Sequence, residues 1–126
     1  MFITADQILA HLVGDYILQS HWMAQNKAKD SIAAAVHAAT YTAPFLFITR
    51  SPLALAVICV SHFCVDRFRL ARFVVWAKNG YALSGKTVTA TGYQEDVPPW
   101  LAVWLLIIAD NTLHLICNGA ALAFFP

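Results

Sequence analysis

Four long apolar segments make up most of this 126-residue chain and restrict the folds open to it. They cover residues 4–24, 31–49, 52–78 and 98–124, and a loop rich in glycine, serine and threonine covers residues 79–97. A helix needs about 20 apolar residues to cross the roughly 30 Å of hydrocarbon in a bilayer, and each segment reaches or approaches that length. We therefore predict an all-α polytopic integral membrane protein, with residues 1–126 forming one domain, a bundle of four transmembrane helices.

The composition favours lipid as the surroundings of this chain. Hydrophobic residues make up 60% of it and charged residues 12%, whereas soluble domains average about 45–50% and about 25%. The formal net charge of +1 offers no basic surface of the kind that binds nucleic acid. Lysine and arginine concentrate after the first segment and around the end of the third. The positive-inside rule then predicts that both chain ends lie outside the cytoplasm and that loop 79–97 lies outside the membrane.

Three pairs of ionisable residues interrupt the apolar segments. Each pair joins a histidine to an aspartate four residues away, so on a helix both side chains share one face, one turn apart. The pairs, with one further histidine in the second segment, are His11 with Asp15, His62 with Asp66, Asp110 with His114, and His37. The order is reversed in the fourth segment, and an antiparallel direction of that helix cancels the reversal.

The depths of these seven residues along their helices place them in a histidine layer and an aspartate layer near the bilayer midplane. An aspartate at the centre of a membrane helix costs about 2.5–3.5 kcal/mol on insertion scales. Interhelical hydrogen bonds in membranes average only about 0.6 kcal/mol, so a purely structural role offsets little of that cost. We therefore expect the seven side chains to face one another as a polar core inside the bundle.

Imidazole nitrogen and carboxylate oxygen are ligands that zinc prefers, and they also suit manganese and iron. We predict a site for a divalent metal, zinc before manganese or iron, with ligands drawn from His11, Asp15, His37, His62, Asp66, Asp110 and His114. Seven groups exceed one tetrahedral site. Either two metals share them, or some aspartates instead hold the N–H groups of the ligating histidines.

A water bound to such a metal has its pKa lowered to about 7 and becomes a nucleophile. The sequence therefore predicts a metal-dependent hydrolase, with Asp15, Asp66 and Asp110 as candidate catalytic carboxylates. Arg69 shares a helix face with Asp66 and could hold a phosphate. With Lys27 and Gln19 it forms the predicted substrate-binding set, and a lipid-borne ester or phosphoester is the predicted substrate.

Two other functions fit the same residues. Carboxylates and histidines at the midplane also build relays, which would suit a transporter or channel for protons or divalent metal. Four short spans without broken-helix signals offer little for alternating access, although a homo-oligomer could build a pore. The third interpretation is a non-enzymatic phage membrane factor that binds a host protein, with a polar core that is only structural.

Several stretches resemble the bacterial and phage membrane family numbered 3307 among domains of unknown function. They are AHLVGDYILQ with the following NKAK, then VHAATY, VSHFCVDRFR and IIADNTLHL. The resemblance covers nearly the whole chain except residues 79–97. It implies a multi-pass helical protein of the bacterial inner membrane, a phage or prophage origin, and no established activity. Histidines and aspartates within helices are also similar, more weakly, to membrane-bound metal-dependent hydrolases.

Overall fold

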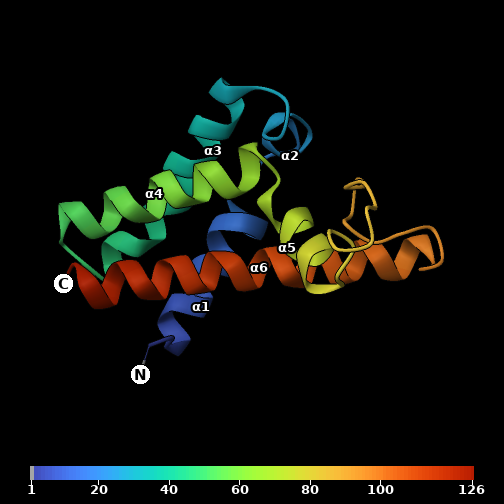
Figure 1. Ribbon diagram of the computed structural model, residues 1–126. Helices are drawn as coiled ribbons and strands as arrows, with labels where there is room; N and C mark the ends of the chain where they lie inside the picture. The colour runs from blue at the N-terminus through green and yellow to red at the C-terminus, as the bar shows by residue number, and fades with distance from the viewer. Residues whose placement is uncertain (1) are drawn as a thin grey trace.

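The computed structural model describes residues 2–126, which contain helices and turns but no strand. The α-helices are α1 (Ala5–Leu12), α2 (His21–Asn26), α3 (Ser31–Thr42), α4 (Pro52–Arg67), α5 (Leu70–Lys78) and α6 (Pro99–Phe124). A π-helical turn, η1 (Val13–Ile17), continues α1, and a 3₁₀ turn, η2 (Ala43–Phe47), continues α3. The long helix α6 runs antiparallel to α4, α3 packs on α4, and α1 crosses α6 (Figure 1).

The predicted all-α class holds for residues 2–126, but the prediction of four transmembrane helices is wrong. Within this described part, α6 is the one helix long and apolar enough to cross a membrane. Its 26 residues rise about 39 Å, whereas the 16 residues of α4 rise about 24 Å, less than the roughly 30 Å of hydrocarbon. The predicted topology, with both chain ends outside the cytoplasm, depended on four crossings and is therefore not supported.

The first predicted segment is divided because its backbone changes helix type. α1 passes directly into the π turn η1, and the chain then leaves the helix before Ser20 caps α2 by accepting the Met23 N–H at 3.2 Å. Gly14 in η1 permits a close approach to α3, because a Cβ there would lie 2.6 Å from Tyr41 Cδ2. The segment therefore folds as α1, η1 and α2 in succession, with α1 packed against α6 and both η1 and α2 packed against α3.

Arg69 divides the third predicted segment into α4 and α5. Its backbone is left-handed (φ 52°, ψ 50°), and no other non-glycine residue in 2–126 has a positive φ. That conformation costs roughly 1–2 kcal/mol for a residue with a side chain. The Arg69 guanidinium donates a hydrogen bond to the Ala90 carbonyl at 2.7 Å, which ties the break to loop 79–97.

The fourth segment folds as predicted, because α6 ends at Phe124 and begins at Pro99, one residue after the predicted start. Only 11% of its most apolar window is buried, so most of its side chains are at least partly accessible. The interior of the molecule is instead rich in polar groups. The buried polar side chains are Gln7, His11, Asp15, His37, His62, Asp66, His114 and Asn118.

Candidate metal centre

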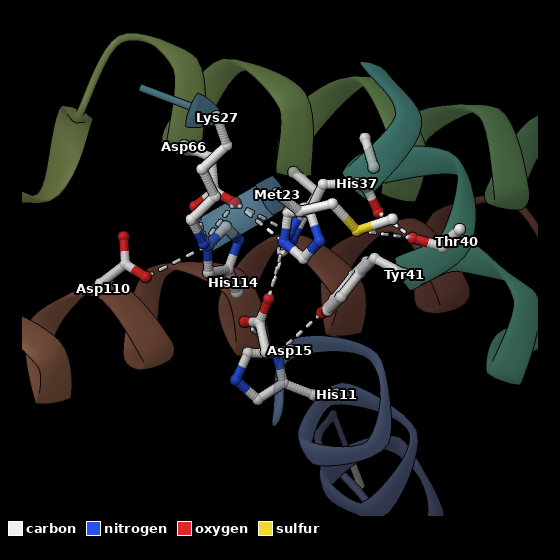
Figure 2. A network of polar contacts seen from close by, with 12 residues as sticks. His11, Asp15, Met23, Lys27, His37, Thr40, Tyr41, Asp66, Asp110 and His114 are labelled. Atoms are coloured by element: carbon white, nitrogen blue, oxygen red, sulfur yellow. Dashed lines mark hydrogen bonds and ion pairs between the residues drawn. The ribbon is translucent and has the colours of Figure 1, made fainter. Parts of the chain in front are cut away.

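Six of the seven predicted ligands meet in one cluster, and they come from four elements (Figure 2). Asp15 is supplied by η1, His37 by α3, and the remaining four are His62 and Asp66 on α4 and Asp110 and His114 on α6. All are buried except Asp110, whose side chain is 31% exposed. The packing of α3, α4, α6 and η1 thus brings residues from positions 15 to 114 to a single point.

A first group of four ligand atoms consists of Asp15 Oδ1, Asp66 Oδ2 and the Nε2 atoms of His37 and His62. The two nitrogen atoms lie 2.9 Å apart. The four nitrogen–oxygen separations range from 3.1 to 3.4 Å. Ligands bound about 2.0 Å from a tetrahedral zinc ion lie about 3.3 Å from one another. These five separations are therefore close to those of a tetrahedral ligand set, and all four atoms lie within 4.8 Å of one another.

A second group adjoins the first and shares Asp66 with it. His114 Nε2 lies 3.2 Å from Asp66 Oδ1 and 3.3 Å from Asp110 Oδ2. The two oxygens of Asp66 therefore serve different groups, Oδ2 the first and Oδ1 the second. Both groups have the composition and closeness of groups that could hold a metal ion.

The π turn directs Asp15 toward the cluster and away from its predicted helix partner. Asp15 Oδ1 lies 3.1 Å from His37 Nε2, whereas Asp15 Oδ2 lies 3.6 Å from His11 Nδ1. A π turn changes the spacing of successive side chains around the helix axis, and such turns are frequent at functional sites. The aspartate thus pairs across helices, which its four-residue spacing from His11 does not indicate.

His11 lies beside the cluster but belongs to neither group of ligand atoms. Its Nε2 donates to Asn111 Oδ1 at 2.7 Å, because an amide oxygen can only accept. Its Nδ1 therefore accepts from the Tyr41 hydroxyl at 2.8 Å, and that hydroxyl oxygen accepts from Asn118 Nδ2 at 2.6 Å. Both ring nitrogens are engaged, so the structure does not place His11 as a ligand.

The rings of His37 and His62 are positioned by packing. Their Nδ1 atoms are buried without a hydrogen-bond partner among residues 2–126, although metal-bound histidines usually donate that N–H to an acceptor. Tyr41 stacks on His62 with 3.6 Å between ring centroids. His114 also stacks on His62, with 4.1 Å between ring centroids. The sequence pattern of histidine–aspartate pairs includes neither Tyr41 nor Asn118.

Two carboxylates of the cluster, Asp15 and Asp66, are held ionised. Burial alone would raise the pKa of Asp15 and of Asp66, but hydrogen bonds from the surrounding histidines outweigh it and lower both pKa values. Burial would likewise lower the pKa of Lys27, yet the nearby Asp66 and Asp15 raise it. Lys27 Nζ lies 2.9 Å from Asp66 Oδ2, so a cation already faces the first group.

A pocket of about 280 Å³ opens beside the cluster. The carboxylates that line it are Asp15, Asp66 and Asp110, and its other polar side chains are Tyr16, Gln19, Lys27, Arg69 and Arg72. All three predicted substrate-binding residues therefore line one pocket next to the predicted ligands. The sequence did not indicate Arg72 as a pocket residue. It is one of the cations around the end of the third segment, which the positive-inside rule relates to membrane topology.

Comparison with known proteins gives one match. The sequence model of the family described as "Protein of unknown function (DUF3307)" matches residues 3–121. Neither a curated protein nor a solved structure matches the chain. The weaker likeness to membrane-bound metal-dependent hydrolases therefore finds no support, and a phage origin stays untested.

Proposed function

The chain belongs to the DUF3307 family, whose description assigns no activity, and we propose from its site that it is a metal-dependent hydrolase of a lipid-borne phosphoester. The observation that carries this proposal is the first group of ligand atoms. Its nitrogen–nitrogen and nitrogen–oxygen separations are close to those of a tetrahedral ligand set, beside a pocket lined by carboxylates and cations.

The donor set favours zinc, with manganese and iron as the other metals that accept imidazole and carboxylate together. Charge supports a divalent ion. The two buried carboxylates of the first group face one cation, Lys27, and a divalent ion would compensate the remaining negative charge and that of nearby Asp110. When bound, such an ion supplies Lewis acidity and a water of lowered pKa.

The pocket residues favour a phosphoester over a neutral ester. Lys27, Arg69 and Arg72 line the pocket and supply cations, and arginine binds phosphate oxygens through paired N–H groups. In the hydrolysis that we propose, the oxygen of water forms a bond to phosphorus and the bond to the alcohol oxygen breaks. A proton from that water ends on the released alcohol.

The lipid-borne character of the substrate is supported by the position of α6. Leu106 and Ile107 of this helix form an apolar wall of the pocket. The same helix is the candidate membrane span, and it exposes large apolar side chains such as Trp104 and Ile108. A lipid beside α6 would have its headgroup next to Lys27, Arg69 and Arg72, the cations that line the pocket. We accordingly infer an inner-membrane location for the chain.

Elemental analysis of protein purified in mild detergent tests the metal. We expect a transition metal in the wild type and its loss in His62→Ala and Asp66→Ala, because each removes a ligand. His21→Ala, which changes the exposed histidine outside the cluster, should keep the metal. Phosphate release from vesicles that contain phosphatidic acid tests the reaction. A wild type that binds no metal at neutral pH contradicts the proposal.

A second candidate function is transport of protons or divalent metal. The observation that favours it is a continuous chain of contacts from buried His37 through Asp66 and His114 to the partly exposed Asp110. With one candidate span in the described residues, a homo-oligomer would have to build the pore. Flux in liposomes that disappears in Asp15→Asn, without any hydrolysis by the wild type, would favour transport over the first proposal.

A further inference from the structure

We propose that the centre holds two metal ions bridged by the carboxylate of Asp66. This inference rests on the proposed metal-binding function and assigns the two ions different roles. The ion of the first group is enclosed, and the ion of the second group faces the pocket and therefore the substrate.

Asp66 has the geometry of a bridge. Its Oδ2 lies 3.1 Å from His62 Nε2 and 3.2 Å from His37 Nε2, whereas its Oδ1 lies 3.2 Å from His114 Nε2. The side chain is 3% exposed, so both oxygens are committed to protein groups rather than to solvent. A carboxylate that offers one oxygen to each of two adjoining ligand sets is the arrangement that links two metal ions in hydrolytic two-metal sites.

The two groups differ in the number of ligands and in access. The first group has four protein ligands, all buried, which is typical of a closed structural zinc site. The second has three, Asp66, Asp110 and His114, which is typical of a catalytic site that keeps an open position. Asp110 is partly exposed and lines the pocket, so that open position faces the substrate space.

The charges of the site agree with two ions and an anionic substrate. Asp15, Asp66 and Asp110 bring three negative charges, and Lys27, ion-paired to Asp66, brings one positive charge. Two divalent ions would leave the centre with an excess of positive charge, which a phosphoester in the adjoining pocket would neutralise. The second ion and the cations that line the pocket would then both contact the same phosphate.

Metal stoichiometry tests this inference with Zn²⁺ or Mn²⁺ as the only added ligand. We expect two ions per chain in the wild type and one in Asp110→Asn, because the substitution weakens only the second group. Asp96→Asn changes an exposed loop carboxylate and should keep both ions. In the Mn²⁺-loaded wild type, electron paramagnetic resonance should show two exchange-coupled ions, and Asp110→Asn should show an uncoupled one.

The outcomes separate this inference from the proposed function. One ion per chain in both wild type and Asp110→Asn overturns the second site and leaves metal binding by the first group standing. Two ions without exchange coupling overturn the bridge. No ion in the wild type overturns the proposed function itself. Circular dichroism of Asp110→Asn checks that the helices are intact. We expect this variant to fold, because the Asp110 side chain is partly exposed.

Discussion

Asp66 makes more polar contacts than any other residue of the centre. Its oxygens face Lys27 and the three histidines of the two ligand groups within 3.2 Å. Removing one partner of a buried ion pair leaves the other charge uncompensated, and that loss exceeds what the intact pair contributes. The stability of the metal-free chain should therefore depend on Asp66 through Lys27.

We expect Asp66→Asn to lower the free energy of unfolding of the metal-free protein. The loss should lie near the lower end of about 3–5 kcal/mol, because the Lys27 side chain is 22% exposed. Adding Lys27→Met should recover part of it, since no unpaired cation is then left. Denaturant unfolding in detergent with a chelator measures both values, with Asp96→Asn as the control. An equal loss in the single and double variants would count against this pairing.

The pKa values of the metal-free centre define a pH range of stability. Because the pKa values of Asp15 and Asp66 lie below their ordinary 3.8, their contribution is present above pH 3.8 and lost as pH falls through the lowered values. Burial would lower the pKa of His37, but hydrogen bonds to Asp15 and Asp66 raise it above 6.5. Its contribution is therefore present below pH 6.5 and lost as pH rises through the raised value.

Bound metal should stabilise the protein at alkaline pH, where the metal-free protein loses the contribution of His37. Metal ligation requires neutral imidazole, so the increase in Tm on adding Zn²⁺ should grow as pH rises past the ordinary histidine pKa of 6.5. Thermal unfolding with chelator and with Zn²⁺, over roughly pH 4 to 8, measures the two curves. A Zn²⁺ effect of equal size at every pH would show that the histidines are not the ligands.

At the scale of the elements, the sequence predicted which residues meet but not how the backbone delivers them. The four-residue spacing placed three of the four histidines beside an aspartate, and six of the seven predicted ligands meet in the cluster. The spacing could not indicate the π turn η1, because AHLVGDYILQ has no proline and its apolar pattern continues. It could not indicate the left-handed Arg69 either, since glycine is the usual residue there.

Gly14 connects the π turn to the metal centre, and Gly14→Ala tests that connection. The new Cβ would lie 2.6 Å from Tyr41 Cδ2, and overpacking of this kind costs about 1–3 kcal/mol. We expect a lower Tm and weaker metal binding, because η1 and Asp15 must move away from α3. In Gly85→Ala nothing lies within 4 Å of the Cβ, although the backbone at φ +69° is strained. That control should lose stability but keep its metal.

At the scale of the molecule, α6 combines candidate metal ligands and an exposed apolar surface. One side supplies Asp110 and His114 to the centre, and the helix also exposes large apolar side chains. Composition predicted contact with lipid, but the total apolar content could not distinguish four spans from one. Only the lengths of the continuous helices decide this, and breaks at η1 and Arg69 shorten the first and third segments below a span.

A charge on the outward side of α6 tests whether this helix crosses the bilayer. Ile108 is 58% exposed, lies near the middle of the helix and does not line the pocket. Arginine at the centre of a membrane helix costs about 2.5–3.5 kcal/mol, so Ile108→Arg should shift the chain out of the membrane fraction in vesicle flotation. Leu83→Arg, at a residue 96% exposed in loop 79–97, should float like the wild type. Because the Ile108 side chain is exposed and does not line the pocket, the protein in detergent should keep its metal. Equal flotation of both variants would exclude α6 as the span.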